Sequence, residues 1–575
     1  MNVALNVSCY LDLRAESCYE QSLFTKRRIF MTRNVARILI LLRKWRRGLS
    51  GFDVFKVWFF AVVIGVAAAY GVIGFRFVIN QVSGIAFGES ETMVVSGAAS
   101  LRVWRAWAAP VIGGFAVSGL LYLAHRYGWL AKGRAEGVAD VIEARAVAGG
   151  RVSTRAGLAS AAVAAVSIGA GASAGREGPA AHLGATIASL LDRHMGFDAK
   201  QRRTLLGCGA AAAVSASFNA PVAGVLFALE VVLGNYALSV FGPIAAASVA
   251  AAVVARIHLG DFPAFNPPDY GAAAAIDVPL AALLGVVCGL MASLFLLSTE
   301  QMTVRLREFA QERGFSYLLL PPIGGVLVGL IGAFYPEVFG VGYEAVANAL
   351  NGEYTVVMLI VLVAAKLAAT AITLSCRFGG GVFAPGLVMG AFAGAAFGAG
   401  LGAVLPEATA SPVYYAMIGM GAAGGAIMGA PISTTLIVFE MTGEYGITIS
   451  LMVAAAIATL IVQWLCGQSF FHWQLSRRGY DLSEGPQGVI LQTIRVRDVM
   501  DAMPAGAPLS EEAPRLDAGA SLGAALAALT ETSESGLPVV DESQDRAAII
   551  GYLTRIKALA SYNKALIDQH VEHHT

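Results

Sequence analysis

The sequence is poor in charge. Only 14% of its 575 residues are Asp, Glu, Lys or Arg, whereas 57% are hydrophobic and the mean hydropathy is +0.66. A soluble domain carries about a quarter charged residues, so a large soluble core is excluded because its surface would need far more charge. The chain is therefore predicted to be a membrane protein that crosses the bilayer several times. Its formal net charge of +1 gives no reason to expect a nucleic-acid partner.

Cysteine is scarce as well. The six cysteines are scattered, and the sequence contains no CxxC pair and no cluster of His and Cys. Neither a zinc site nor a disulfide framework is therefore predicted, and nothing in the sequence calls for another cofactor. Cys208, Cys288 and Cys466 lie in apolar segments and are predicted to be packing residues.

The N-terminal region has no long apolar run. Residues 1–25 are polar and mixed, so they are not predicted to be a signal peptide. Residues 26–47 carry nine basic side chains and no acidic one, with Leu39–Leu42 between them. This pattern predicts a basic amphipathic helix on the cytoplasmic membrane surface, within a separate segment of residues 1–50. A solvated charged tail is the alternative, and Met31 is a plausible start of translation.

Apolar segments follow one another from Val54 to about Cys466, and many are short or interrupted by Gly and Pro. Such segments predict helices that are tilted or that stop within the bilayer. The 65 glycines of the chain allow these helices to pack closely in lipid.

Two distant stretches share one spacing. Gly175–Pro179 reads Gly-Arg-Glu-Gly-Pro and Gly381–Pro385 reads Gly-Val-Phe-Ala-Pro, and each is followed five residues after its proline by Gly-Ala. A glycine-rich break that opens a helix in a membrane aims backbone N–H groups at an anion. Two such breaks in matching positions predict one anion site built from both halves of the chain.

A second pair of matches follows in the same order. An Ala-Pro step is followed nine residues after its proline by a glutamate in both halves, Glu230 and Glu440, and a Gly-x-Gly-Ala-Ala run precedes each step, at Gly207–Ala211 and Gly419–Ala423. The two glutamates are 210 residues apart, close to the 206 residues that separate the two glycine-rich breaks. An internal duplication is therefore predicted.

The duplication divides the membrane region into residues 51–258 and 275–475, joined by the polar, proline-bearing stretch 261–270. Whether the halves run parallel or inverted does not follow from these matches. Basic residues flank several apolar segments, and the positive-inside tendency predicts that these loops and both chain termini are cytoplasmic. The expected location is the inner or plasma membrane of the cell.

The ordered motifs resemble those of the CLC chloride channels and proton/chloride antiporters over about residues 50–480. Gly175–Pro179 matches the family's GREGP motif and Gly381–Pro385 its GxFxP motif, and Phe218–Pro221, Gly340–Tyr343 and Glu440–Thr442 are similar to further signatures. The resemblance implies an all-α membrane protein of the bacterial type, built from an inverted repeat of tilted and broken helices. It also implies a transport protein rather than an enzyme, and a homodimer with one anion pathway in each subunit.

The resemblance assigns roles at the predicted anion site. The backbone N–H groups of Val382 and Phe383 are expected to face a central chloride or similar anion, and those of Arg176 through Gly178 an outer one. Glu177 is expected to be the gate and proton acceptor, because a carboxylate in place of the anion blocks the pathway until it is protonated. An ion pair between Arg176 and Glu177 is the structural alternative.

The sequence departs from the family at the first anion-site motif. Where the family commonly has Gly-Ser-Gly-Ile-Pro, this chain has Ala135–Ala139, so the expected anion-binding residues are Glu136, Gly137 and Val138. An ionised Glu136 would repel chloride. The carboxyl is therefore expected to be protonated, turned away or part of a proton route, unless it merely lies near basic residues at a cytoplasmic mouth.

Two further departures leave the transport mode open. The family's inner tyrosine is matched by Phe471, which lacks the hydroxyl donor, and the internal proton-transfer glutamate of antiporters is matched by Val231. An apolar residue there favours a passive channel over a proton-coupled antiporter, and the transported anion stays open. His182 either tunes Glu177 or, as the favoured interpretation, is a packed helix residue, and Glu230 is read as structural. A membrane anion sensor is a distant alternative.

The C-terminal region changes character. Residues 490–565 resemble a single cystathionine-β-synthase-type (CBS) module, an α/β unit expected in the cytoplasm, and residues 566–575 form a tail. Lys557 stands where such modules have an acidic residue that binds ribose, so nucleotide binding is not expected. A role in stability or dimerisation is favoured instead.

Overall fold

The computed structural model describes residues 55–130, 134–193, 195–260, 265, 267–269, 275–405, 410–480, 491–492, 494–502, 514–532, 535–541 and 549–574. It divides the chain after Phe60 into two units, and the described part of the first unit is the start of a helix. The predicted N-terminal segment, residues 1–50, lies outside the described residues. The second unit, residues 61–575, holds everything that follows.

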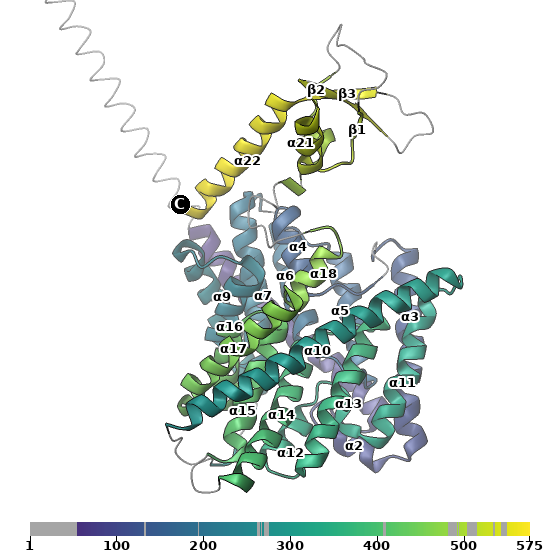
Figure 1. The fold of residues 1–575 in the computed structure, drawn as a ribbon, viewed down its shortest axis with the longest axis vertical. Coiled ribbons are helices and arrows are strands. Elements are labelled where there is room, and N and C mark those ends of the chain that lie inside the picture. The colour runs from purple at the N-terminus through teal and green to yellow at the C-terminus, as the bar shows by residue number, and fades with distance from the viewer. Residues whose placement is uncertain are drawn as a thin grey trace, which may run out of the picture. The chain divides into compact units, whose positions relative to one another are not determined.

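The described part of the membrane region consists of helices and the segments that connect them (Figure 1). The elements of the first predicted half are the helix Phe55–Phe87, α2 (Val94–Ser100), α3 (Val103–Arg126), α4 (Val138–Val147), α5 (Thr154–Gly169), α6 (Glu177–Asp192), α7 (Ala199–Phe218), α8 (Pro221–Phe227), the π-helical turn η1 (Ala228–Leu233) and α9 (Leu238–Leu259).

The second predicted half repeats this pattern of long and short helices. Its elements are α10 (Asp277–Glu312), η2 (Tyr317–Leu319), α11 (Leu320–Phe334), η3 (Pro336–Val338), α12 (Tyr343–Leu350), α13 (Val356–Ser375), α14 (Phe383–Val404), α15 (Pro412–Met428), α16 (Pro431–Thr442), η4 (Tyr445–Ile447), α17 (Thr448–Cys466) and α18 (Phe470–Ser476).

Helix lengths confirm that this is a multi-pass membrane protein. Within the described residues, eight helices are long and apolar enough to cross a bilayer. With 36 residues, α10 is about 54 Å long, well beyond the roughly 30 Å of a hydrocarbon core, so it must tilt or extend past it. By contrast α8 has 7 residues and α12 has 8, too few to cross. The sequence was thus right in predicting tilted and interrupted helices.

The two halves end and restart a helix in the same way. In the first half α7 ends at Asn219 with a φ of 57°, and in the second α15 ends at Gly429 with a φ of 71°. Only Gly, and less readily Asn, adopts this left-handed conformation at low cost. Each is followed by Ala-Pro, and Pro221 and Pro431 begin α8 and α16, where the missing N–H of proline costs nothing.

Glu230 and Glu440 cap each other's repeat. The Glu230 carboxylate accepts hydrogen bonds from the N–H groups of Ile432 (3.2 Å) and Ser433 (2.7 Å) at the start of α16. The Glu440 carboxylate accepts from Val222 (3.1 Å) and Ala223 (2.7 Å) at the start of α8. Because the exchange is reciprocal, the repeats meet about a local two-fold axis. The structural role predicted for Glu230 is confirmed.

Glycine-to-glycine crossings fix the register of the repeats. α6 crosses α7 at Gly184 and Gly209, and α14 crosses α15 at Gly390 and Gly419; a Cβ at any of these positions would strike backbone of the facing helix. Gly209 therefore corresponds to Gly419. The matching Gly-x-Gly-Ala-Ala runs would instead align Gly207 with Gly419, a register that differs by two residues. The sequence pattern does not show which glycine faces the neighbouring helix.

The C-terminal module is a small α/β unit with its own core. Its sheet has the order β1 (Leu516–Asp517), β2 (Gly536–Val540) and β3 (Ile549–Thr554), with β1 parallel and β3 antiparallel to β2. The helices bounded within the described residues of this module are α20 (Val496–Val499), α21 (Leu522–Glu531) and α22 (Arg555–His574).

The backbone of α22 continues through most of the predicted tail, residues 566–575. Lys557 pairs with Asp501 at 2.8 Å, so its ammonium group has a carboxylate partner within the module.

Candidate functional site

The two glycine-rich breaks lie against each other. Gly175 and Gly381 exchange backbone hydrogen bonds, with nitrogen-to-oxygen distances of 2.8 and 2.6 Å, and form an antiparallel bridge. This brings together the start of α6, at Glu177, and the start of α14, at Phe383. Such closeness needs glycine, since a Cβ at Gly381 would lie 3.1 Å from the nitrogen of Gly178. Two electropositive helix N-termini therefore converge on one place, as the sequence predicted.

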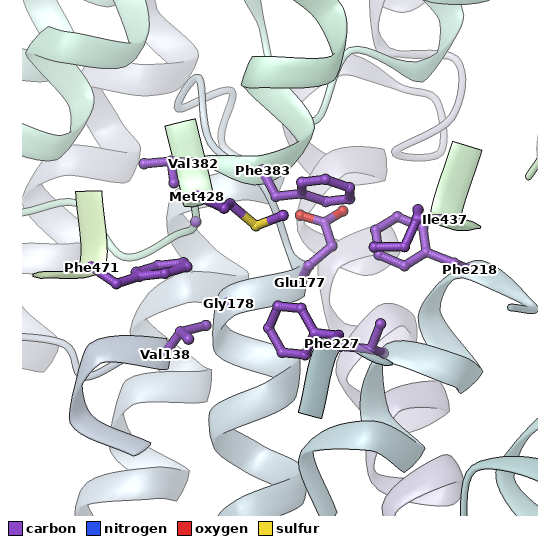
Figure 2. Close-up of a pocket in the computed structure, with 12 residues that line it drawn as sticks. Val138, Glu177, Gly178, Phe218, Phe227, Val382, Phe383, Met428, Ile437 and Phe471 are labelled. Atoms are coloured by element: carbon purple, nitrogen blue, oxygen red, sulfur yellow. The ribbon is translucent and has the colours of Figure 1, made fainter. Parts of the chain in front are cut away.

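A cavity lies at this convergence, and Figure 2 shows the side chains around it. Six of the residues predicted from the sequence line it, namely Val138, Glu177, Gly178, Val382, Phe383 and Phe471. The remaining lining residues are Gly381 and Phe218, which begin motifs named in the sequence, and Val214, Phe227, Met428 and Ile437, which sequence reasoning did not select. These last four are apolar and carry no chemical signal, so only the folded chain identifies them as lining residues.

The Glu177 carboxylate occupies this cavity (Figure 2). The residue is only 4% exposed, and its Oε1 accepts a hydrogen bond of 3.4 Å from the hydroxyl of Tyr343. A carboxylate therefore lies where two helix starts favour an anion. Tyr343 ends a motif noted in the sequence, but its contact with Glu177 was not foreseen.

Arg176 does not pair with Glu177. Its guanidinium forms an ion pair with the buried Glu91, donates to the carbonyl of Ser217 (3.3 Å) and lies 5.0 Å from the centre of the Tyr343 ring. Arg76 joins the same carboxylate at 3.0 Å. The alternative of an Arg176–Glu177 ion pair is therefore wrong. Glu91, which the sequence analysis missed, neutralises much of the positive charge beside the site.

Two residues predicted to bind the anion are turned elsewhere. Glu136 and Gly137 do not line the cavity that Val138 lines. The N–H of Glu136 donates to Ser160 Oγ (2.8 Å), and the N–H of Gly137 donates to Asp140 Oδ2 (2.9 Å). Because these amides are already bonded within the protein, they are not free to face an ion in the cavity. Of the open alternatives for Glu136, the structure shows that its side chain is turned away.

The Glu136 side chain faces His182. Its Oε2 lies 3.4 Å from Nε2 of His182, and the imidazole is only 1% exposed. The histidine is packed inside the protein, as the favoured interpretation predicts. The carboxylate of Glu136 lies beside its ring.

Ion pairs surround Asp140, in the first turn of α4. Arg134 and Arg478 each lie 3.0 Å from Asp140, and Arg478 also lies 2.7 Å from Glu143. Burial alone would raise the pKa of the Asp140 carboxyl, but the charges of the two guanidinium groups outweigh it and hold that pKa well below its usual range. Asp140 therefore stays ionised and holds the start of α4 in place.

Phe471, near the start of α18, presents its ring to the cavity, as the count along the sequence predicted. Phenylalanine offers no hydroxyl, so this wall of the cavity has no side-chain donor at that position. Val231 lies in the π-helical turn η1 beside the capping residue Glu230. Among the residues that the structure describes, no group of three or more His, Cys, Asp or Glu side chains is placed to hold a metal ion.

Comparison with known proteins agrees with this geometry. The family model described as voltage gated chloride channel matches residues 113–463. The putative chloride channel protein ClcB-like of Ralstonia nicotianae is 34% identical over 400 residues, which cover 68% of this chain and 90% of that protein. The voltage-gated ClC-type chloride channel ClcB of Escherichia coli (strain K12 / DH10B) is 31% identical over 420 residues, covering 72% of this chain and 96% of the relative.

Solved structures share the fold. A slow cyanobacterial Cl−/H+ antiporter aligns with a TM-score of 0.63 at 21% identity, covering 74% of this chain and 98% of that one. A CLC-type fluoride/proton antiporter aligns with a TM-score of 0.58 at 20% identity, covering 72% and 96%. With the family model matched over more than half of the chain, and two relatives above 30% identity aligned over most of their length, the chain belongs to the CLC family of chloride channels and antiporters.

Proposed function

We propose that this CLC protein carries chloride or a similar small anion through a pathway in each subunit of a homodimer, and that Glu177 is the gate. The observation that supports this most is the position of the Glu177 carboxylate, in the cavity at the joined starts of α6 and α14. Both helix dipoles favour negative charge there. A free anion and the carboxylate therefore compete for one place.

Protonation decides this competition. A neutral Glu177 loses its attraction to the helix starts and leaves the cavity, and the anion enters. The partial charges of backbone amides bind the anion without holding it as tightly as a fixed cation would, which allows release. The guanidinium of Arg176 is engaged with Glu91, in keeping with a site built from backbone groups.

The side chains that line the cavity influence which anions the protein selects. Phe471 brings no hydroxyl, and Glu136 is turned towards His182, so the two side-chain donors expected from the family are missing from the cavity. An anion here is held by backbone N–H groups and apolar surface. We therefore expect weak discrimination among halide-like anions, since little but size and dehydration distinguishes them.

The test is anion flux from liposomes that contain the purified full-length chain, measured between about pH 5 and pH 8. Flux of the wild type should increase on acidification. Glu177→Gln, which mimics the protonated gate, should be active at every pH and lose this dependence. Glu353→Gln, an exposed carboxylate in a turn, is the matched control.

Two outcomes would contradict the proposal. An unchanged pH profile in Glu177→Gln would remove the gate role. Absence of flux for chloride, bromide, nitrate and fluoride alike would remove the transport role and favour an anion sensor instead.

A proton-coupled antiporter is the second candidate. Val231 supplies no inner carboxyl, which favours a passive channel, but a buried His182 beside Glu136 offers titratable groups on the inner side. Both modes require the same gate. We also propose that both termini are cytoplasmic, because basic pairs such as Arg202–Arg203 and Arg477–Arg478 flank apolar segments.

A further inference from the structure

A buried histidine continues the face of α6 that lines the cavity. Gly178 lines the cavity, and His182 follows it four residues later, so the two lie on one side of the helix, one turn apart. His182 is 1% exposed, and neither ring nitrogen forms a hydrogen bond with the residues that the structure describes. A buried imidazole without hydrogen bonds costs about 1–3 kcal/mol, so its ring nitrogens are available to a bridging water molecule.

Glu136 links this histidine to the side of the site that carries Arg134 and Arg478, named the inner mouth because the Arg477–Arg478 pair is proposed to be cytoplasmic. The bonds from the amides of Glu136 and Gly137 to Ser160 and Asp140 fix the backbone, and the carboxylate then lies 3.4 Å from His182 Nε2. Its side chain is 15% exposed, against 1% for the histidine. Two residues further on, Val138 already lines the cavity. The pair therefore runs from the partly exposed carboxylate of Glu136 to the fully buried ring of His182, beside the anion cavity.

The groups around the pair come from every element packed against it. On α6 itself the neighbouring carboxylate is Glu177, α4 and the residues before it carry Arg134, Asp140 and Glu143, and α18 is followed by Arg478. The buried stretch of α7 carries Cys208, α5 carries the exposed Arg155 at its start, and the helix Phe55–Phe87 carries Arg76, which pairs with Glu91. No titratable residue lies in the first three turns of α14.

Most of these charges are already matched. Arg134 and Arg478 pair with Asp140, and Arg478 also pairs with Glu143. The Glu136 carboxylate contacts His182, and an imidazole nitrogen can bind and release a proton. With a neutral imidazole, the carboxylate leaves a negative charge next to the cavity. With one added proton, the pair is neutral overall.

We propose that Glu136 and His182 form a proton-binding pair that exchanges protons between the inner mouth and Glu177. This rests on the gate role proposed for Glu177 and on the second transport mode above, the proton-coupled antiporter. A proton from water at the inner mouth binds the pair, and the pair passes it through water in the cavity to the Glu177 carboxylate. The step breaks one N–H or O–H bond and forms one O–H bond, and no other reactant is needed.

Distance and charge both suit this role. His182 is five residues along α6 from Glu177, a rise of about 7.5 Å, which one or two bridging waters can span. Protonation of the pair also removes the negative charge of Glu136, which would otherwise repel an anion entering the cavity. Proton and anion are thereby favoured in the same state. The pair also supplies a carboxyl group to a chain in which Val231 supplies none.

The test measures chloride and proton fluxes together in liposomes that contain the full chain, with a chloride gradient as the driving force. The wild type should move protons against a proton gradient. His182→Gln and Glu136→Gln should each lower the proton flux by about tenfold or more while chloride flux stays within about threefold, in the range of losses seen when a proton-transfer group is removed. Glu353→Gln, the exposed carboxylate already used as a control, should keep both fluxes.

The outcomes separate this inference from the gate proposal. Chloride flux without proton flux in the wild type, or proton flux retained in both variants, overturns the pair and leaves the gate of Glu177 intact. If the wild type carries no anion, the gate proposal fails. The pair is then judged by infrared difference spectra between acid and neutral pH. A carboxyl band lost in Glu136→Gln supports it, and an unchanged spectrum overturns it.

Discussion

Tyr343 is the side chain whose hydroxyl reaches the Glu177 carboxylate. Its ring also lies over Arg176, at 5.0 Å, and packs edge-on against Phe265, at 5.5 Å. The aromatic contacts hold the ring in place whether or not the hydroxyl is present. The hydrogen bond, at 3.4 Å, is long and therefore weak, so its removal should change gating without disturbing the fold.

We expect Tyr343→Phe to shift the pH profile of anion flux. Loss of a donor to the charged carboxylate favours its protonated form, so flux should persist to higher pH. A weak hydrogen bond contributes about 0.5–1.5 kcal/mol, and a shift of one pH unit corresponds to about 1.4 kcal/mol. The midpoint should therefore rise by less than about one unit.

The control for this variant is Tyr414→Phe, which removes a buried hydroxyl bonded to Ser450 at 2.7 Å and does not line the cavity. It should leave the midpoint where it is in the wild type. A midpoint that falls in Tyr343→Phe, or an equal rise in both variants, would contradict the role given to the Tyr343 hydroxyl.

Motif spacing predicted residues whose backbone makes the site, and it was less successful with side-chain direction. Gly178, Val382 and Phe383 follow from glycine-rich breaks, because the break itself fixes where a helix starts. Glu136 was expected at the anion, but its direction depends on hydrogen bonds to Ser160 and Asp140 that no local pattern encodes.

At the scale of elements, the reciprocal caps explain why both halves keep a glutamate nine residues after a proline. Each carboxylate satisfies two N–H groups at a helix start in the opposite half. The proline at the first helical position leaves the next amides as the ones in need of an acceptor. The sequence predicted the duplication from this spacing, but it could not show that each glutamate serves the other half.

Removing one cap should lower stability rather than change ion selectivity. Glu440→Ala leaves the amides of Val222 and Ala223 without their carboxylate and should cost about 1–3 kcal/mol. Glu230→Ala should cost a similar amount, because its bonds to Ile432 and Ser433 have matching lengths. Thermal unfolding of the purified protein, followed by tryptophan fluorescence, measures this as a lower Tm.

The exposed Glu353 again offers a control, since its replacement by alanine should stay within about 0.5 kcal/mol of the wild type. A Tm unchanged in both cap variants would show that water replaces the carboxylates at no cost. A large fall in one variant with none in the other would contradict the equivalence of the two repeats.

At the scale of the whole chain, the anion site and the C-terminal module draw on separate parts of the sequence. Residues lining the cavity fall between Val138 and Phe471. The module has a core of its own, which includes Val496, Leu522 and Leu553. The change in charge near residue 490 predicts a domain boundary there. The function of the module did not follow, because its described residues hold no group of His, Cys, Asp or Glu side chains placed to bind a metal ion.

The separation predicts that the module can be removed without loss of transport, provided that the cut spares Arg478. A chain ending after Tyr480 keeps the ion pairs from Arg478 to Asp140 (3.0 Å) and Glu143 (2.7 Å), which hold α4 beside the cavity. We expect its anion flux in liposomes to stay within about threefold of the full chain, as for a change that leaves every contact of the site in place.

A chain ending after Ser476 is the matched comparison, because it lacks the module and also Arg478. Asp140 then keeps its contact with Arg134 but loses that with Arg478, and Glu143 also loses its contact with Arg478. Unpairing charges that are largely buried costs about 3–5 kcal/mol when the loss is complete, and less where a second partner remains. Flux and Tm should both fall in this shorter chain. Equal loss of flux in the two truncations, with both still folded, would mean that the module itself takes part in opening the pathway.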